Sequence, residues 1–423
     1  MTSASLRKVY SSPDAKARVS AFDGDEINFM NAISQNTCKE IAGLMSAAAN
    51  IMTGQTNNNA AAVVFDALAG SYMLSLADTI VDIDVVSRAR MVMEDDSTYA
   101  TLSRRLDKHH VPKNSGRALL SATFPEDFFY RKGDVVIREG ILTNGVLDKA
   151  TLGSEAGSII QALYKDYGQE RTVVFITDIY RVAGVFMDTH SLSVTMDDCY
   201  LDEKGRKAIR YEIEKSKMLV KSMGQKLTDP LEEERREAQI RGYLDTAKNF
   251  GSKISKEYLT PTNSFNIMSS SGAKGSSSNV SQITGILGQQ FIAGERPKET
   301  LPYFDNTDLD PVTRGFITNS FLSGLTPAEV FFSLQSSRPA VVESATSISD
   351  VGTIHRHLTK AMENLKVVED GSVRNSAGVI YQFAYEDGLD ASLVESVRAP
   401  SGSFTNFVNL ERFIMKANTK YGY

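Results

Sequence analysis

The segment that begins at Thr326 constrains the fold more than any other part of the sequence. Thr326-Pro327-Ala328-Glu329 is a capping box with proline at the first helical position, which predicts the start of a helix. The segment behind it can be helical to about Lys366, which is roughly 60 Å at 1.5 Å per residue. Pro339 and Gly352 are expected to interrupt this helix, with a kink at Pro339. A helix of this length is typical of a rod that spans a cleft or joins two modules.

A charge-dense segment, residues 201–258, predicts two more helices. Asp229 and Pro230 mark the start of the second one, as the N-cap and the first helical residue. The segment also carries an apolar stripe among lysine, arginine and glutamate, formed by Ile209, Ile213, Val220, Met223 and Leu227. Two helices of about 20 residues each, joined this tightly, predict an antiparallel hairpin that stands mostly in solvent.

The earlier part of the chain changes from helical to mixed patterns. Residues 37–49 are alanine-rich and residues 63–76 place apolar side chains at every fourth position, so both stretches predict helices. From about residue 128 to 195, short β-branched runs at 135–137 and 172–176 lie between turns such as Thr143-Asn144-Gly145. This pattern predicts short strands. The sequence as a whole predicts an α+β fold.

Residues 269–278 are rich in serine and glycine, which by composition is typical of a flexible linker. The apolar residues on both sides have helical spacing, however, and they argue against a linker: Phe265, Ile267, Met268, Val280, Ile283, Ile286 and Leu287. Lys274 lies between Gly272 and Gly275, and exposed backbone amides beside a cation suit a phosphate site. The sequence leaves a plain loop open as the alternative.

Composition and charge exclude several classes of protein. Hydrophobic residues make up 42% of the 423 residues and charged residues 23%, which excludes wholesale disorder. The net charge of −6 argues against a surface that binds nucleic acid over its whole extent. Cys38 and Cys199 cannot build a disulfide scaffold, and no Cys/His cluster offers a zinc site. Without an apolar leader or a long apolar run, we expect an intracellular protein with no membrane partner.

Acidic and basic pairs offer a few candidate sites. The carboxylates of Asp23-Gly24-Asp25 can point to one side and hold a hard cation such as Mg²⁺, although spacing alone favours an acidic surface turn. Such a cation would serve two-metal phosphoryl transfer. Asp197-Asp198 is expected to be a helix-start feature. Arg356, within His355-Arg356-His357, either contacts phosphate or lies on a solvated helical face. Arg374-Asn375-Ser376 is, by itself, a loop.

Several of these stretches together resemble the largest subunit of multisubunit DNA-directed RNA polymerases, in the form found in eukaryotes and large DNA viruses. Their order and spacing match along almost the whole chain. The resembling stretches are Phe22–Asn28, Ser271–Ser276, Asn279–Gln282, Gly288–Gln290, Thr300–Pro302, Arg314–Phe316, Asn319–Phe321, Gly324–Pro327, Arg374–Ser376, Gln382 and Glu386–Gly388.

The resemblance implies a fold and a set of regions. It implies part of a double-psi β-barrel active-site region, a mixed α/β pore, an antiparallel funnel helix hairpin and a long bridge helix. The expected regions are the metal loop and following helices (1–80), the pore (81–200), the funnel hairpin (201–260), a helical pore and cleft region (261–324), the bridge helix (325–367) and the start of a cleft or jaw region (368–423).

The resemblance also assigns roles to residues. Asp23 and Asp25 are expected to be catalytic ligands of Mg²⁺. Lys274, Gln289 and Gln290 are expected to line the pore through which nucleotides arrive. The DNA-facing residues of the bridge helix are expected to be Arg338, Ile348, Ser349 and Arg356.

The chain departs from the family where the chemistry takes place. The metal loop of the family reads Asn-Ala-Asp-Phe-Asp-Gly-Asp, whereas here Val19 replaces the asparagine and Ala21 replaces one of three aspartates. Losing a charged ligand should weaken Mg²⁺ binding, because affinity for hard cations follows ligand charge. In the bridge helix, Ile348-Ser349 replaces a Thr-Ala pair, Thr353 a tyrosine and Ser336-Ser337 a Gly-Gly hinge.

Two functions therefore stay open. The first is a subunit of a split, viral RNA polymerase that acts only in a complex, inside the host cytoplasm or nucleus or in the virion. The clamp, the first part of the barrel and the trigger loop would then come from elsewhere. Its partners would be the other fragments of the largest subunit, the second-largest subunit, the DNA template, the RNA product and nucleoside triphosphates. The second is a non-catalytic structural or regulatory homologue that has lost one ligand at Ala21.

Overall fold

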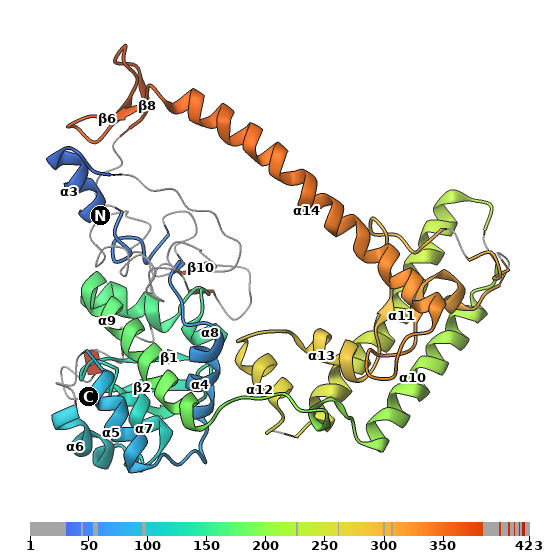
Figure 1. The fold of residues 1–423 in the computed structure, drawn as a ribbon, viewed down its shortest axis with the longest axis horizontal. Helices are drawn as coiled ribbons and strands as arrows, with labels where there is room; N and C mark the ends of the chain where they lie inside the picture. Colours follow the sequence, from blue (N-terminus) through green and yellow to red (C-terminus); the bar gives the residue numbers. More distant parts are fainter. Residues whose placement is uncertain are drawn as a thin grey trace. The chain divides into compact units, whose positions relative to one another are not determined.

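The computed structural model describes most of the chain between residues 31 and 383 and short pieces beyond. The described residues are 31–43, 45–53, 58–94, 99–225, 227–260, 262–298, 301–305, 308–383, 397–398, 405–406, 410, 414 and 417–418. Here the fold is mixed, with helices and small antiparallel sheets, which confirms the α+β expectation in its coarse form (Figure 1). The chain divides into a first unit (1–193, 267–274 and 388–423) and a second unit (194–266 and 275–387).

The first unit combines short helices with one three-stranded sheet. Its helices are α3 (Gln35–Gly43), α4 (Phe65–Ser75), α5 (Ile83–Val92), α6 (Tyr99–Lys108), α7 (Gly116–Ser121), α8 (Lys149–Leu152) and α9 (Ile159–Thr189). Its strands are β1 (Tyr130–Lys132), β2 (Val135–Arg138) and β3 (Ile141–Asn144), with the pair β9 (Val397–Arg398) and β10 (Thr405–Asn406). Helix α12 (Ser264–Ser271) crosses into this unit at residue 267.

Helix α9 forms the centre of the first core. Phe175, Ile179, Val182 and Phe186 are fully buried at spacings of three and four residues, and α9 packs against α4 and α5. The strand expected at residues 172–176 is therefore wrong. A buried helix can carry a β-branched apolar run, and over five residues periodicity does not separate it from a strand. Gly168 interrupts the helix with φ 77° and ψ −177°, a backbone conformation that glycine adopts without the strain it would cause in other residues.

The sheet confirms the expected strand at 135–137. Strand β2 lies between β1 and β3 in antiparallel pairing, with Tyr130 opposite Ile137 and Ile137 opposite Leu142. Val135 and Ile137 are buried and alternate with more exposed residues, as one buried face requires. The turn after β3 contains Gly145, at φ +88°, where a Cβ atom would lie 2.5 Å from the Cα of Val135. This glycine lets the chain turn closely past β2.

The two helices expected near the N-terminus differ in outcome. Helix α4 lies within the expected residues 63–76, whereas α3 ends at Gly43, well short of residue 49. Residues 47–50 form turns, where Asn50 donates a side-chain hydrogen bond to the carbonyl of Ser46. Alanine favours a helix only weakly without packing, and α3 buries none of its residues.

The second unit is built on a helical hairpin. Its elements are η1 (Asp197–Cys199), α10 (Glu203–Ser222), α11 (Pro230–Tyr258), α13 (Ser277–Thr284), β4 (Gly288–Gln289), η2 (Pro311–Arg314), β5 (Phe316–Ile317), α14 (Pro327–Met362), β6 (Lys366–Val367), β7 (Val373–Arg374) and β8 (Ile380–Gln382). Strand β4 pairs with β5, and β6, β7 and β8 form a small antiparallel sheet.

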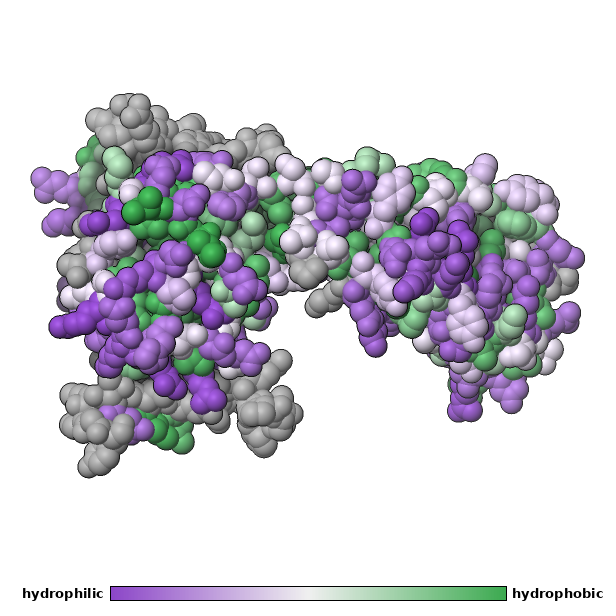
Figure 2. Space-filling view, turned by 90° about the horizontal axis from the view of Figure 1, so that it is seen from below, coloured by the Kyte–Doolittle hydropathy of each residue, from purple (hydrophilic) through white to green (hydrophobic). Residues whose placement is uncertain are grey.

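The hairpin of α10 and α11 confirms the prediction for residues 201–258. Ile209, Ile213 and Val220 of the predicted stripe are buried against α11, whereas Leu227 is 42% exposed. The Asp229 carboxylate accepts a hydrogen bond from the backbone of Leu231, as an N-cap should. The hairpin does not stand wholly in solvent, because α11 also packs against α13 and β4. Figure 2 shows mainly hydrophilic side chains over its visible face.

The serine- and glycine-rich segment is not a linker. Residues 269–271 complete α12 and residues 277–284 form α13, so only a short turn separates the two helices. The Ser276 hydroxyl caps α13 by accepting a hydrogen bond from the Asn279 amide. The helical spacing of the apolar flanks therefore decides the structure here, and the linker composition misleads.

Helix α14 is continuous from Pro327 to Met362, and it ends four residues before the expected Lys366. The expected interruption at Pro339 and Gly352 is wrong, and Figure 1 shows a single rod. Proline removes one backbone hydrogen bond, that to the carbonyl of Gln335. The turns on both sides still form, so one lost bond and one glycine do not end the helix.

Candidate functional site

The predicted metal loop lies outside the described residues. This applies to Asp23 and Asp25 and to the two departures at Val19 and Ala21. Within the described part of the chain, no group of three or more histidine, cysteine, aspartate or glutamate side chains could hold a metal ion. The magnesium assignment therefore stays a prediction that rests on the chemistry of two carboxylates.

The start of α14 is tied to the ribbon of β4 and β5 by Glu329. The Glu329 carboxylate accepts hydrogen bonds from the backbone amides of Thr318, Asn319 and Thr326 and from the Asn319 side chain, at 2.8–3.3 Å. Burial alone would raise the pKa of Glu329, but the hydrogen bonds from Asn319 and Thr326 lower it below its ordinary value. The predicted capping box is confirmed, and it does more than cap, because it also fixes the helix to residues 318–319.

Gln289 and Gln290 lie on this ribbon. Gln289 is buried, and its side-chain amide donates to the carbonyls of Gln290 and Arg314, at 2.9 and 2.8 Å. The side-chain oxygen of Gln289 is buried and has no hydrogen-bond partner among the described residues. Gln290 is half-buried, and its backbone amide donates to Gly315. The Gln289 side chain therefore links β4 to the turn that precedes β5 through hydrogen bonds.

The body of α14 lies in solvent within its unit. The two buried residues of the helix, Glu329 and Phe332, both lie in its first two turns. Beyond Ser337 nearly every side chain is exposed, including apolar ones such as Ile348 at 74%. Helices in proteins owe most of their stability to packing, and a helix without packing is only marginally stable in water. A long helix with so many bare apolar side chains is suited to contact with other molecules.

Three of the predicted DNA-facing residues share one face of α14. Arg338 and Arg356 are 18 residues apart, which is five turns at 3.6 residues per turn, or about 27 Å. Ser349 lies 11 residues after Arg338, about three turns, and so falls on the same face. Ile348 projects about 100° away. Within the described part of the chain, neither arginine forms an ion pair, and both are exposed. They are available to bind an anionic partner.

Between the two arginines this face carries mainly small residues, with the exposed Val342 about 40° from the line of Arg338 and Arg356. Ala345 and Gly352 lie near the line that joins Arg338, Ser349 and Arg356, and both are exposed. A side chain of this size lets a large partner approach the helix backbone closely. The face therefore carries mostly small side chains in its middle and a positive charge at each end.

Lys274 lies in the first unit, at the turn after α12. Its ammonium is 5.0 Å above the ring of Phe65, in a cation–π contact, and the side chain is otherwise exposed. Gly272 and Gly275 on either side have φ of +74°. At Gly272 a Cβ atom would lie 2.6 Å from the Cβ of Lys149, so a glycine is required there. Phe65 is a neighbour that sequence spacing could not indicate.

Asp197 and Asp198 lie in the one-turn helix η1, whereas the first helix of the hairpin begins at Glu203 with Asp202 as its N-cap. The expectation of a helix start therefore holds for this short turn and not for the hairpin. The carboxylate of Asp198 has a different role. It accepts hydrogen bonds from the backbone of Thr195 and, across 66 residues of sequence, of Ser264. The hydrogen bond from Thr195 and that from Ser264 lower the pKa of Asp198. Asp198 therefore joins the segment before α10 to the start of α12.

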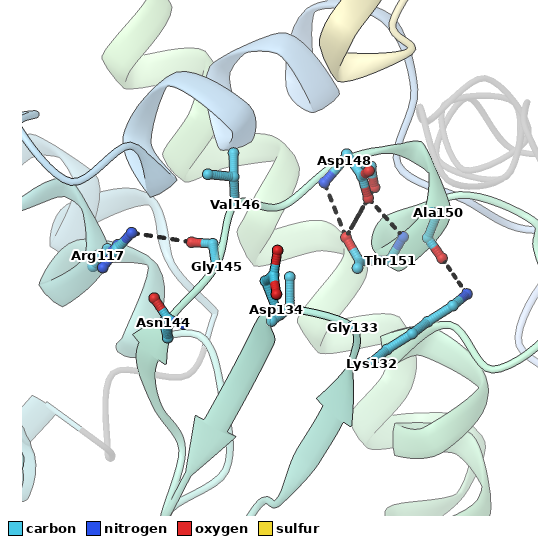
Figure 3. Close-up of a pocket in the computed structure, with 11 residues that line it drawn as sticks. Arg117, Lys132, Gly133, Asp134, Asn144, Gly145, Val146, Asp148, Ala150 and Thr151 are labelled. Carbon is cyan, nitrogen blue, oxygen red and sulfur yellow. Dashed lines mark hydrogen bonds between the residues drawn. The ribbon is translucent and has the colours of Figure 1, made fainter. Parts of the chain in front are cut away.

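A cavity of about 550 Å³ lies beside the sheet of the first unit (Figure 3). Lys132 donates from one wall to the carbonyl of Ala150 at 2.6 Å, and Arg117 donates to Gly145 at 3.1 Å. Burial lowers the pKa of both basic groups. Because these cations bind backbone carbonyls, they hold the turn around Asp148 in place, and the cavity is a structural feature.

Sequence comparison places these observations in a family. Residues 50–199 match the family described as RNA polymerase Rpb1, domain 3. Residues 212–317 match RNA polymerase Rpb1, domain 4, and residues 324–410 match RNA polymerase Rpb1, domain 5. The three matches follow one another in order and include most of the hairpin, the ribbon and α14.

Individual relatives agree with this assignment. The chain is 30% identical to DNA-directed RNA polymerase subunit Rpo1N of Methanocaldococcus jannaschii, over 95% of this chain and 31% of the relative. It is 28% identical to the Rpo1N subunit of Sulfolobus acidocaldarius, over 93% of this chain and 47% of the relative. A probable DNA-directed RNA polymerase II subunit RPB1 homolog of Invertebrate iridescent virus 6 is 29% identical, over 95% of this chain and 42% of the relative.

The chain thus spans about a third to a half of the length of these relatives. Among the described residues no helix is long and apolar enough to cross a membrane. The ordered family matches and the relatives, one of them viral, lead to one conclusion: the chain belongs to the family of the largest subunits of multisubunit DNA-directed RNA polymerases.

Proposed function

We propose that this chain is one part of the largest subunit of a multisubunit RNA polymerase, and that α14 is the bridge helix that contacts the template beside the active site. One observation carries this proposal above the others. Over most of its length α14 exposes its side chains on every side, with Arg338 and Arg356 at the two ends of one small-residue face. A helix of this kind suits a position between a nucleic acid and other subunits.

In this proposal the other regions serve the same reaction. Asp23 and Asp25 would hold Mg²⁺, which supplies a Lewis acid to nucleotidyl transfer when it is bound. The hairpin of α10 and α11 and the region around Lys274, Gln289 and Gln290 would form the funnel and pore. The partners would be the remaining parts of the largest subunit, the second-largest subunit, DNA, RNA and nucleoside triphosphates.

Arg338 and Arg356 give the sharpest test of the template contact. In the assembled complex, the double substitution R338Q/R356Q should weaken binding to a template–primer duplex and lower the slope of log affinity against log salt by about 2, since each phosphate contact contributes about 1. Arg210, an exposed arginine on α10, provides a control, because R210Q should leave the slope unchanged. An unchanged slope in the double variant would refute the contact.

A non-catalytic homologue is the second candidate, and Ala21 and Val19 favour it. The two functions differ in Mg²⁺-dependent RNA extension by the reconstituted complex. If the chain contributes to catalysis, Ala21→Asp should raise the rate or lower the Mg²⁺ concentration needed for half-maximal extension, because it restores a charged ligand. If neither the natural chain nor this variant supports extension in a complex that binds template normally, the structural function stands.

A further inference from the structure

A second cavity, of about 1410 Å³, lies within the second unit, between the first half of α11 and residues 295–314. Its floor is formed by charged side chains from both segments. Four arginines line the cavity among the described residues: Arg236, Arg241, Arg296 and Arg314. None of them belongs to the residues that were predicted from the sequence to bind nucleotide, DNA or metal.

Three of these arginines share a single carboxylate. Glu237 contacts Arg314 at 2.8 Å, Arg296 at 3.3 Å and Arg236 at 3.7 Å. Arg236 also pairs with Glu233, through two hydrogen bonds of 2.9 and 3.0 Å. Two carboxylates therefore stand against the charge of three guanidinium groups, before Arg241 is counted.

Arg241 adds a fourth positive charge, and the nearest carboxylate that interacts with it, Glu295, is also paired with Lys298. One of its guanidinium nitrogens donates to the backbone carbonyl of Gly294 at 3.1 Å, which is a neutral partner. Its Nε is buried and has no hydrogen-bond partner within the described residues. Glu233 and Glu237, the two carboxylates hydrogen-bonded to this group, therefore leave two of its four guanidinium charges uncompensated, although the whole lining has five acidic and five basic side chains.

Arg296 is the most deeply buried member of the group. Its side chain is 4% exposed, and its Nε also has no hydrogen-bond partner among the described residues. Burial lowers the pKa of Arg296 to about 10, and its contact with Glu237 offsets this only in part. A buried guanidinium with an unused donor is costly unless an anion satisfies it.

The other charged residues of the cavity balance this excess in formal charge, but they lie at exposed positions. Glu295 pairs with Lys298 at 2.6 Å, and both lie at the exposed rim. Glu234 and Asp308 are exposed, where water and salt screen their charge. A ligand in the cavity would interact mainly with the buried guanidinium groups, because salt screens buried charges least.

From this charge excess and these unused donors we propose that the cavity binds a phosphate-bearing small molecule on Arg241, Arg296 and Arg314. Arginine forks match the oxygens of a phosphate group and form the stronger, charge-assisted hydrogen bonds. The cavity is larger than the roughly 300–1,000 Å³ of most small-molecule sites, so it has room for a nucleoside phosphate as well as for inorganic phosphate or pyrophosphate. The proposal does not depend on polymerase activity.

The test is a calorimetric titration of the full chain with pyrophosphate at constant ionic strength, in the form in which the chain is isolated. We expect saturable binding, and we expect Arg241→Gln to weaken it about tenfold or more, since one charge-assisted hydrogen bond is lost. Glu237→Gln should tighten binding several-fold, because it removes the carboxylate that competes for Arg296 and Arg314. The exposed arginine Arg210 supplies the matched control, and R210Q should leave the dissociation constant within twofold.

Thermal unfolding without ligand checks that each variant is folded. The test uses Arg241→Gln because Arg296 is deeply buried, and a variant at Arg296 that did not fold would leave the Arg241 result intact. Parallel titrations with inorganic phosphate and a nucleoside triphosphate identify which source of the phosphate binds best. The proposal is overturned if pyrophosphate binds no better than chloride, if Arg241→Gln and Glu237→Gln both leave binding unchanged, or if an acidic peptide binds the floor more tightly than every phosphate compound.

Discussion

Helices α9 and α14 have similar lengths and opposite surroundings. Helix α9 spans 31 residues with an interruption at Gly168, and it buries apolar side chains such as Phe175, Ile179 and Phe186 along one face. Helix α14 has 36 residues and buries only Glu329 and Phe332. It also contains Pro339, Gly352 and many serine and β-branched residues, which are poor helix formers. The core of its own unit stabilises α9, whereas the exposed side chains of α14 are suited to contacts outside its unit.

The largest expected difference between these helices concerns truncation of a core side chain. Phe175→Ala in α9 should lower the free energy of unfolding by about 3–5 kcal/mol, because it leaves a cavity in a closely packed core. Urea unfolding followed by circular dichroism measures this change. A loss below about 1 kcal/mol would mean that α9 is not the centre of the core.

Pro339 should limit the local stability of α14. Pro339→Ala restores a backbone donor and removes a clash, so the helix around residue 339 should gain about 3 kcal/mol against local opening. Amide hydrogen exchange of residues 335–345 reports this gain. Ala340→Gly, which adds no donor and lowers helix propensity, is the matched control and should speed exchange.

The Glu329 tie should contribute less, and it should depend on pH. Glu329→Gln keeps the shape but removes the charge that six donors share, so we expect a loss of about 1–3 kcal/mol. The pKa of Glu329 is lowered in the folded chain, so its contribution is complete above the unfolded pKa of about 4.3 and disappears as pH falls through the folded pKa. Stability profiles of both proteins between pH 3 and 7 should therefore converge at the acid end.

The smallest effect is expected on the exposed part of α14. Ile348→Ala should change the stability of the chain by less than about 0.5 kcal/mol, since 74% of this side chain is already in water. The same substitution in the assembled complex should cost more, if other molecules cover α14. Equal and small effects in both states would show that Ile348 stays exposed after assembly.

Local signals in the sequence predict the frame of the molecule well. The capping box at Thr326 and the Asp229-Pro230 pair place the starts of α14 and α11, because both depend on hydrogen bonds within one turn. The strand expected at residues 172–176 fails because its short apolar run belongs to a buried helix, whose period is visible only over a longer window. The family resemblance carried the functional assignment further than any single motif did.

The sequence could not predict contacts that join distant segments. The carboxylate of Glu237 reaches Arg296 and Arg314 over 59 and 77 residues of chain, and the local pattern around Glu237 is that of an ordinary charged helix. The Lys274–Phe65 contact is likewise formed by two parts of the chain that have no common motif. Only the fold brings such residues together.

The tie at Glu329 gives α14 the mechanics of a lever. Its 36 residues form an arm of about 54 Å that is fixed at one end and unsupported by its own unit along the rest. A tilt of about 5° at the base would sweep Met362 through about 5 Å, close to one helical turn. Small displacements of residues 318–319 that tilt the helix would therefore become much larger displacements at the far tip of the arm.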